Sequence, residues 1–232
     1  MNLPLSLVVF AYNEEPNIPS VLPDILAWLR GHGEDYELIF VNDGSTDRTL
    51  PLARDVLAND PRTKIVSHDR NLGIGAALKT GVRSATLPWV SFLPCDGQIP
   101  ASELDRLCCA VNCENVTVAF SVYRARDDGF LRKVLSLGVR GLILAIHGVV
   151  MRSDGPYLFR REIFDPDLLA PDSFFLNFEF PIRVFRSGER YSTVTIDCVP
   201  RLRGASKSAG LKRIVDVAKD LLGLRWRLWQ GR

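Results

Sequence analysis

Short apolar runs alternate with amphipathic stretches through the first 121 residues, and turn-forming residues separate them. This alternation is typical of a mostly parallel β-sheet with helices on both faces, which places the chain in the α/β class. We predict strands at Leu5–Ala11, Glu37–Asn42, Lys64–Ser67, Trp89–Leu93 and Val116–Val122. We predict helices near residues 17–30, 47–59, 74–85 and 101–112.

The second half of the chain is less regular, and two amphipathic helices are its clearest features. Drawn as a helix with 100° per residue, residues 130–148 gather their polar side chains into one narrow arc and leave the other sides apolar. The arc holds Arg132, Lys133, Ser136, Arg140 and His147. Because Arg140 interrupts the apolar stretch Val134–Met151, we predict a helix that lies at a membrane interface or lines a groove and does not span a bilayer.

Residues 211–229 also project as an amphipathic helix, with Lys and Arg on one side and Leu and Trp on the other. Arg225 interrupts the apolar side, on which we place Leu222 and Trp229. Such a helix can lie in a membrane interface or pack against its own domain or a partner, and the pattern leaves both open. We expect residues 209–232 to form this basic amphipathic C-terminal helix as an addition to one domain, residues 1–208.

The charge is unevenly distributed along the chain. Nine of the 29 Lys and Arg residues, but only two of the 27 Asp and Glu residues, lie in residues 201–232. A basic tail can meet an anionic membrane, phosphate or nucleic acid. Trp226 and Trp229 favour contact with a membrane or a protein, so we expect no nucleic-acid partner.

The cysteines and the N-terminus indicate a reducing compartment. The five cysteines are odd in number and show no paired zinc-binding spacing, so we expect reduced thiols in the core. The first apolar run, Leu5–Phe10, is short, lacks a basic region before it and stops at Asn13, which predicts a strand and not a signal peptide. We therefore expect a cytoplasmic protein.

Polar turns follow the first, second and fourth predicted strands, at the edge where open α/β sheets bind ligands. Glu14 and Asp43 can accept hydrogen bonds from a nucleotide base or ribose. Asp96 and Gln98 offer two oxygen ligands of the kind that Mg²⁺ or Mn²⁺ takes together with a diphosphate. For Asp47 a cap on the following helix is the stronger interpretation.

Taken in order, these segments resemble the family 2 glycosyltransferases of the GT-A fold, and specifically the dolichol-phosphate mannose synthase-like branch. The similar segments are Tyr12–Glu14, Asp43–Ser45, Asn71–Gly73, Asp96–Gln98, Gly155 with Leu158–Arg161, Glu179 and Arg201–Lys207. The resemblance covers most of the chain. It implies a Rossmann-like GT-A domain at residues 1–208, with a nucleotide-sugar half at 1–122 and an acceptor half at 123–208.

The resemblance also implies roles for individual residues. The implied contacts of the donor nucleotide are Ala11, Tyr12, Glu14, Val41, Asp43 and Asp96. The implied ligands of Mg²⁺ or Mn²⁺ are Asp96 and Gln98. The candidate catalytic residues are Asp96, Glu179, Arg201 and Lys207, and the last two would neutralise phosphates. Three positions depart from the family pattern: Pro94 and Met151 replace aspartates, and Phe10 replaces a proline.

We therefore expect an inverting glycosyltransferase that moves a sugar from a GDP- or UDP-linked donor to a lipid phosphate such as polyprenyl or dolichyl phosphate. The candidate contacts of the acceptor phosphate are Arg132, Ser136, Arg140, Arg201 and Lys207. The protein would lie peripherally on the membrane, alone, as a homo-oligomer or with a membrane-protein partner. A hydroxyl acceptor, with Glu179 as base, and a non-catalytic partner subunit remain alternatives.

Overall fold

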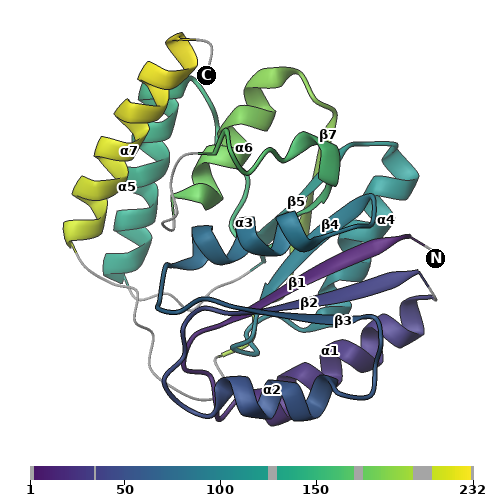
Figure 1. Ribbon diagram of the computed structural model, residues 1–232. Coiled ribbons are helices and arrows are strands. Elements are labelled where there is room, and N and C mark those ends of the chain that lie inside the picture. The colour runs from purple at the N-terminus through teal and green to yellow at the C-terminus, as the bar shows by residue number, and fades with distance from the viewer. Residues whose placement is uncertain (1–2, 34, 125–129, 170–174, 201–210, 231–232) are drawn as a thin grey trace.

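Seven strands form one mixed β-sheet in the computed structural model of the protein (Figure 1). Their order is β3-β2-β1-β4-β6-β5-β7, and β6 is antiparallel to both of its neighbours. The strands are β1 Leu5–Ala11, β2 Tyr36–Asn42, β3 Thr63–Ser67, β4 Trp89–Pro94, β5 Val118–Tyr123, β6 Leu158–Arg160 and β7 Tyr191–Ile196. The predicted α/β class with a mostly parallel sheet is confirmed.

The structure describes residues 3–33, 35–124, 130–169, 175–200 and 211–230, with the backbone alone for 130–135 and 211–216. The helices are α1 Ile18–His32, α2 Thr49–Leu57, α3 Ile74–Ser84, α4 Leu104–Glu114, α5 Phe130–His147, α6 Leu176–Ser187 and α7 Leu211–Trp229. Two short 3₁₀ turns, Ala101–Glu103 and Arg161–Ile163, complete the described elements. The expected boundary between residues 122 and 123 falls at the end of β5, inside the single sheet, and the division into two halves stays a prediction.

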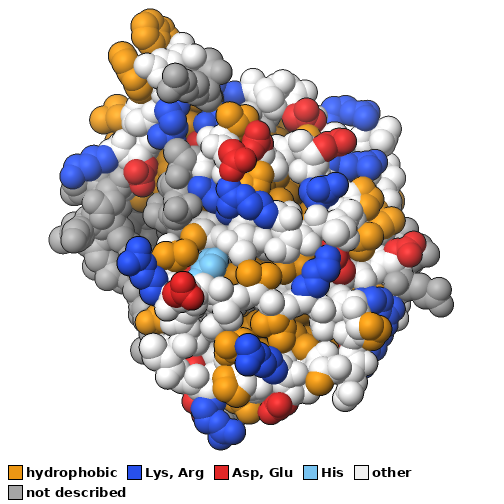
Figure 2. Space-filling model, in the orientation of Figure 1, with side chains coloured by type: hydrophobic (Ala, Val, Ile, Leu, Met, Phe, Trp, Pro, Cys, Tyr) orange, Lys and Arg blue, Asp and Glu red, His pale blue; other side chains and the backbone are white. Residues whose placement is uncertain are grey.

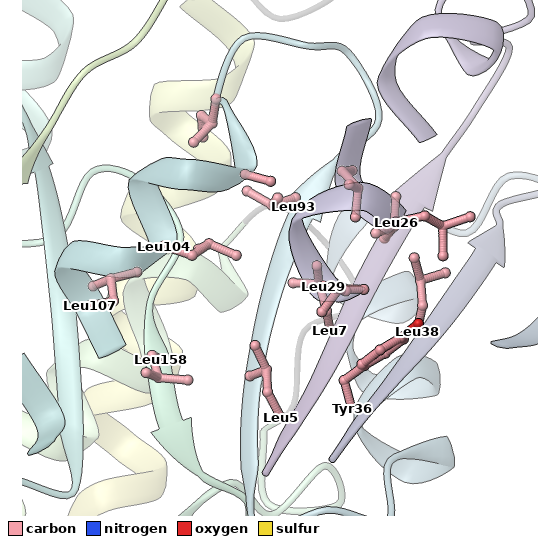
Figure 3. Close-up of a cluster of buried hydrophobic side chains, with 14 of the residues drawn as sticks. Leu5, Leu7, Leu26, Leu29, Tyr36, Leu38, Leu93, Leu104, Leu107 and Leu158 are labelled. Carbon is pink, nitrogen blue, oxygen red and sulfur yellow. The ribbon is translucent and has the colours of Figure 1, made fainter. Parts of the chain in front are cut away.

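Every residue of β1 is buried, because β2 and β4 flank it and helices cover both of its faces. Leu5 and Leu7 face a cluster with α1, α2 and α4, and Figure 3 shows Leu26 and Leu29 of α1 within that cluster. Val8, next in the alternation, faces a second cluster with α3 and α6. Apart from Ser6, the sequence of β1 is apolar throughout, as a strand buried on both faces requires.

A buried carboxylate joins the strands at their amino ends. Glu37 on β2 accepts hydrogen bonds from Ser6 Oγ at 2.6 Å, Lys64 Nζ at 2.7 Å and Thr86 N at 2.5 Å. Burial raises the pKa of Glu37, but these donors outweigh it and lower the pKa to about 2. The carboxylate is therefore ionised at neutral pH and holds β1, β2, β3 and the turn before β4 together.

Helices α5 and α7 lie side by side at the left of Figure 1 and pack against α6. The cluster that joins them consists of Ile143, Val149, Met151, Phe175, Ile182, Leu221 and Leu224. Two polar contacts strengthen it: His147 Nε2 bonds to Leu221 O at 3.0 Å, and Arg227 of α7 pairs with Glu179 of α6 at 2.9 Å. Among the described residues, no helix is long and apolar enough to cross a membrane.

The structure adds two strands that the sequence did not predict and corrects the expectation about the cysteines. Strands β6 and β7 were not predicted, because β6 has three residues and the edge strand β7 mixes polar and apolar residues without a continuous buried run. The cysteines are all reduced, but only Cys95 and Cys108 lie in the core, whereas Cys109 and Cys113 are exposed. The helical turn that carries Cys108 inward carries its neighbour Cys109 outward.

The contact between α3 and β1 gives a stability prediction. A Cβ atom on Gly81 of α3 would lie 2.2 Å from Cγ1 of Val8, which is fully buried on β1. We expect Gly81→Ala to lower the free energy of unfolding by about 1–3 kcal/mol, because the helix must move away from the sheet. Urea unfolding followed by circular dichroism measures the change.

Gly31→Ala is the matched control, because Gly31 is also helical and a Cβ there meets nothing within 4 Å. Alanine is the better helix former, so this variant should gain up to about 1 kcal/mol. Equal stability of the two variants would contradict the close approach of α3 to β1.

Candidate functional site

The carboxyl ends of β1, β2 and β4 meet at one edge of the sheet. Ala11 at the end of β1 lies opposite Asn42 of β2, and Phe10 lies opposite Pro94 of β4. The backbone ladder continues one residue beyond the strands, since Asp43 N donates to Ala11 O at 2.9 Å and Cys95 N donates to Phe10 O at 3.0 Å. The turns that follow the three strands therefore begin side by side.

Hydrogen bonds tie the turn after β1 to the turn after β2. Asn13 N donates to Ser45 Oγ at 3.0 Å, and Asn13 Oδ1 accepts from Thr46 N at 2.8 Å. Asn13 has a φ of 52°, a left-handed conformation that asparagine adopts more readily than most residues. Glu14 N donates to Thr49 Oγ1 at 2.8 Å. The backbone around Tyr12 and Glu14 is thereby fixed by the second turn.

Asp47 holds the start of α2, although the N-cap residue itself is Arg48, one position beyond the predicted cap. Its Oδ1 accepts from Thr49 N at 3.0 Å, and its Oδ2 accepts from Glu15 N at 3.2 Å. Burial raises the pKa of Asp47, but the hydrogen bonds from Thr49 and Glu15 outweigh it and the net effect is a lowered pKa. Asp47 therefore supports the edge by joining the first turn to the start of α2.

Asp43 is a buried hub of this edge. Its Oδ1 accepts from Leu72 N at 2.9 Å and contacts His68 Nδ1 at 2.8 Å, and its Oδ2 accepts from Gly73 N at 2.9 Å. A carboxylate has about four acceptor positions. These contacts leave about one acceptor position free, on Oδ2. The main role of Asp43 is therefore to order the Asn71–Gly73 segment, and it could offer a ligand only one further hydrogen bond.

His68 is a member of this edge that the sequence did not predict. It follows β3, its side chain is 9% exposed, and it joins Asp43 to Thr80 Oγ1 of α3, which lies 2.9 Å from its Nε2. A histidine directly after the third strand, at the same edge as the other turns, was the available signal. It links the turn after β2 to the helix that covers the sheet.

Gly44 allows the turn after β2 to touch the segment before α3. Its φ is +68°, and a Cβ there would lie 2.2 Å from the backbone carbon of Arg70. Only glycine fits this contact without displacing the backbone. The Asp43–Ser45 and Asn71–Gly73 segments, which lie apart in the sequence, therefore form one surface.

The Asp96–Gln98 turn lies beside the first turn. Asp96 Oδ1 accepts from Gln98 N at 3.1 Å, and Gly97 between them has a φ of 71°. Burial raises the pKa of the Cys95 thiol, and the negative charges of Glu14 and Asp96 raise it further, so both carboxylates lie near that sulfur. The expected donor-side residues therefore converge.

The Asp96–Gln98 turn also tests the expected divalent ion. Asp96 and Gln98 are partly exposed and supply a carboxylate and an amide oxygen, which are the hard ligands that Mg²⁺ and Mn²⁺ prefer. No group of three or more His, Cys, Asp or Glu residues that could hold a metal occurs in the part of the chain that the structure describes. The residues present thus fit an ion whose other ligands come from elsewhere, such as a diphosphate and water.

One of the expected acceptor-side residues, Arg140, lies next to the end of β5. Arg140 of α5 donates to Met151 O at 3.2 Å and forms an ion pair with Asp154. Asp154 N in turn donates to Ser121 O of β5 at 2.8 Å. Because β5 is parallel to β7 and both β5 and β4 are antiparallel to β6, its carboxyl end lies at the same edge as those of β1, β2 and β4.

The remaining expected residues fall into three groups. Ser136 is exposed on α5, and the side chain of Arg132 is not described. Arg201 and Lys207 lie outside the described residues; just before them, Val199 N donates to Gln98 O at 2.9 Å. Their roles stay predictions.

Glu179 is fully buried and pairs with Arg183 at 2.8 Å and Arg227 at 2.9 Å. These contacts are those of a residue that anchors the core and holds α7 on α6. The predicted catalytic role of Glu179 gains no support from them.

The chain is similar in sequence and in fold to known proteins. The model of the family described as Glycosyl transferase family 2 matches residues 6–169. Undecaprenyl-phosphate 4-deoxy-4-formamido-L-arabinose transferase of Aeromonas hydrophila is 30% identical over 94% of this chain and 66% of its own length. Dolichyl-phosphate beta-glucosyltransferase of Trichomonas vaginalis is 31% identical over 68% of this chain and 53% of its own. The chain thus spans slightly less than two thirds of the first relative and about half of the second.

Among solved structures, glucosyl-3-phosphoglycerate synthase from Mycobacterium tuberculosis superimposes with a TM-score of 0.71. The match covers 95% of this chain and 76% of that one, at 22% identity. That enzyme was crystallised with Mn²⁺, UDP and phosphoglyceric acid. The likeness confirms the GT-A fold.

The Asp43 hub gives a second prediction. Asp43→Asn keeps the shape of the side chain but replaces one acceptor oxygen by a donor, so one of the N–H groups of Leu72 and Gly73 loses its partner. We expect the free energy of unfolding to fall by about 1–3 kcal/mol and amide exchange at Leu72 and Gly73 to accelerate. Urea unfolding and hydrogen exchange by NMR measure these two effects.

Asp69→Asn provides the matched control, because Asp69 lies exposed in the same segment. It should leave both measurements unchanged within error. Unaltered amide exchange in Asp43→Asn would show that the Asn71–Gly73 segment does not depend on this carboxylate.

Proposed function

The chain belongs to glycosyl transferase family 2, and from that premise we propose that it transfers a sugar from a nucleotide-sugar donor to the phosphate of a polyprenyl-type lipid. The arrangement of α5 carries the proposal. Arg140 of this helix is partly buried and pairs with Asp154, whereas the exposed side chains of the helix, among those that the structure describes, are apolar apart from Ser136. A lipid phosphate needs both features, a charged site beside an apolar surface.

The donor nucleotide is proposed to bind across the turns that follow β1, β2 and β4. Ala11, Tyr12, Glu14, Val41 and Asp43 lie in or directly before the first two turns, which are locked together by Asn13. The preformed backbone keeps the cost of ordering the site on binding low. Asp96, which like Glu14 lies near the Cys95 thiol, would complete the nucleotide contact.

Asp96 and Gln98 would hold Mg²⁺ or Mn²⁺. When bound, such an ion supplies positive charge that stabilises the departing nucleoside diphosphate. With Pro94 in place of a second carboxylate, the chain contributes a single carboxylate at this turn, so the affinity for the ion should depend on the diphosphate. Arg201 and Lys207 are proposed to add positive charge to the phosphates.

A phosphate acceptor suits the described residues better than a hydroxyl acceptor. A hydroxyl group needs a general base, and Glu179, the candidate for that role, is buried in ion pairs with Arg183 and Arg227. A phosphate monoester has its second pKa near 6 and is mostly dianionic at neutral pH, so it needs no base. The contacts of Glu179 therefore support the lipid-phosphate proposal.

In the proposed step, a phosphate oxygen of the acceptor attacks the anomeric carbon of the sugar. The bond from that carbon to the donor diphosphate breaks, and its electron pair leaves with the nucleoside diphosphate, so the anomeric configuration inverts. The acceptor phosphate would replace part of the ion pair between Arg140 and Asp154, and Arg140 would then position it. Two relatives are named as transferases of undecaprenyl phosphate and dolichyl phosphate, and these names support this acceptor class.

The outer surfaces of α5 and α7 support peripheral binding to a membrane. Leu137 and Leu144 of α5 are 68% and 50% exposed, and the other exposed residues of this helix, among those described, are Ser136, two glycines and an alanine. On α7 the exposed side chains are Lys219, Leu222, Arg225, Trp226 and Trp229. Figure 2 shows hydrophobic side chains at the upper left, where α7 ends in Figure 1. Leu and Trp with nearby cations are typical of interfacial helices.

Transfer of label tests the proposed function directly. UDP- and GDP-linked radiolabelled sugars are incubated with polyprenyl phosphate in detergent and Mg²⁺, Mn²⁺ or EDTA. We expect metal-dependent label in the lipid phase from one donor, and at least a tenfold loss in Asp96→Ala, because that variant removes the carboxylate beside the diphosphate. Asp24→Ala, an exposed aspartate of α1, is the matched control and should transfer normally.

Other outcomes distinguish the alternatives. Label that appears only on a glycan or small-molecule hydroxyl would replace the lipid phosphate by a hydroxyl acceptor. A folded protein that turns over none of the donors would support a non-catalytic partner subunit.

Vesicle sedimentation tests the membrane surface. The double variant Trp226→Ala, Trp229→Ala should bind anionic vesicles several-fold more weakly than wild type, because it removes two exposed aromatic side chains from the outer face of α7. Leu222→Ala and Leu168→Ala form a matched pair, since these leucines are 60% and 53% exposed but Leu168 belongs to neither α5 nor α7 and borders a pocket beside α6. Equal loss in both leucine variants would argue against a defined membrane surface.

A further inference from the structure

Cys109 and Cys113 lie one turn apart on α4 and are both exposed. Their Sγ atoms are 3.6 Å apart and share a hydrogen bond. Helix α4 begins after the Asp96–Gln98 turn and ends just before β5 starts, so it runs from the donor edge of the sheet to the opposite edge. The two thiols therefore form a surface pair that the proposed transfer reaction does not use.

The distance between the sulfur atoms suits a tetrahedral metal ion. A disulfide would need about 2.05 Å, so the pair is reduced. Two thiolates bound to Zn²⁺ at about 2.3 Å with tetrahedral angles lie about 3.8 Å apart, close to the observed separation. We propose that Cys109 and Cys113 form a dithiol site for a thiophilic divalent cation of tetrahedral preference, the class of Zn²⁺ and Cd²⁺.

The charge balance of the site favours a cation. Binding of M²⁺ replaces one proton on each thiol, so two metal–sulfur bonds form and two protons pass to the buffer. Glu114 follows Cys113 directly and carries a negative charge. The same charge attracts a cation, and Ser192 Oγ holds the Glu114 carboxylate in place at 3.0 Å.

The site is open, with two protein ligands. The structure gives no third His, Cys, Asp or Glu ligand in the described part of the chain, so water or a small thiol would fill the other positions. Affinity should be lower than in a closed four-ligand zinc site, and the ion should exchange. Hard Mg²⁺ or Mn²⁺ belongs to the oxygen ligands Asp96 and Gln98, so the two sites differ in the metals they take.

Titration with Cd²⁺ in the presence of Mg²⁺ tests the proposal on the whole chain. Ultraviolet charge-transfer absorbance and proton release should report one Cd²⁺ and two protons per chain. Cys109→Ser or Cys113→Ser should weaken binding at least tenfold, and the double variant should show no absorbance at the same Cd²⁺ concentrations. Cys198→Ser, which removes a partly exposed thiol outside α4, is the matched control and should match wild type.

Absorbance that persists in the double variant, or none in wild type at millimolar Cd²⁺, would overturn the dithiol site. Sugar transfer is measured in the same samples. Because the pair lies outside the donor edge, the double variant should transfer sugar at the wild-type rate. This expectation holds whether or not the wild type proves to bind Cd²⁺. Failure of the metal site and failure of the proposed transferase function are thus separate results.

Discussion

Parallel pairing of β1 with β2 and β4 is the constraint on which the candidate site depends. It brings the ends of three strands to one edge, so the turns after them start side by side although up to about 80 residues separate them in the sequence. Side chains then fix the turns to each other: Asn13 joins the first two, and Asp43 joins the second to the segment before α3. The burial of β1 on both faces keeps this pairing in register.

The sequence was sufficient to predict four strands of the parallel part of the sheet and the C-terminal helix. Strand β1 has the predicted bounds, and β2, β3 and β4 differ by one residue at one end. Helix α7 covers the projected residues 211–229 and lies within the expected segment 209–232. Continuous apolar runs and clear helical periodicity produced these results. Strands β6 and β7 carry no such pattern, because one is very short and the other lies at the edge of the sheet with several polar side chains partly exposed. Pairing with neighbours determines them more than composition does.

The residue types of the candidate site were also predictable, but their roles depend on contacts that no spacing reveals. Asp43 was expected to face a nucleotide, and it uses most of its acceptor positions on Leu72, Gly73 and His68. Glu179 was a candidate base, and it sits in two ion pairs. His68 was overlooked, because its significance lies in the two partners that tertiary structure gives it. A motif therefore indicates which residues matter at this edge before it indicates what each one does.

The orientation of the two helices of the proposed membrane surface, α5 and α7, could not be predicted from the sequence either. Periodicity separated the polar arc of α5 from its apolar sides, but it could not say which of them faces the protein. The structure turns Arg140 and His147 inward, where Asp154 and Leu221 O receive them, and turns Leu137 and Leu144 outward. Full burial of a leucine side chain is worth about 1.5–3 kcal/mol, so in water this outward face leaves several kcal/mol unused.

On α7, Leu222, Trp226 and Trp229 add to that unused free energy, while Arg227 is held inside by Glu179. Contact of the outer face with lipid would recover it without disturbing the paired charges within. Because each helix also keeps one side packed within the protein, the same argument would favour a helix that lies along a membrane surface over one that crosses it. The inward ion pairs fix the rotation of both helices, and that rotation decides which side chains a membrane could meet.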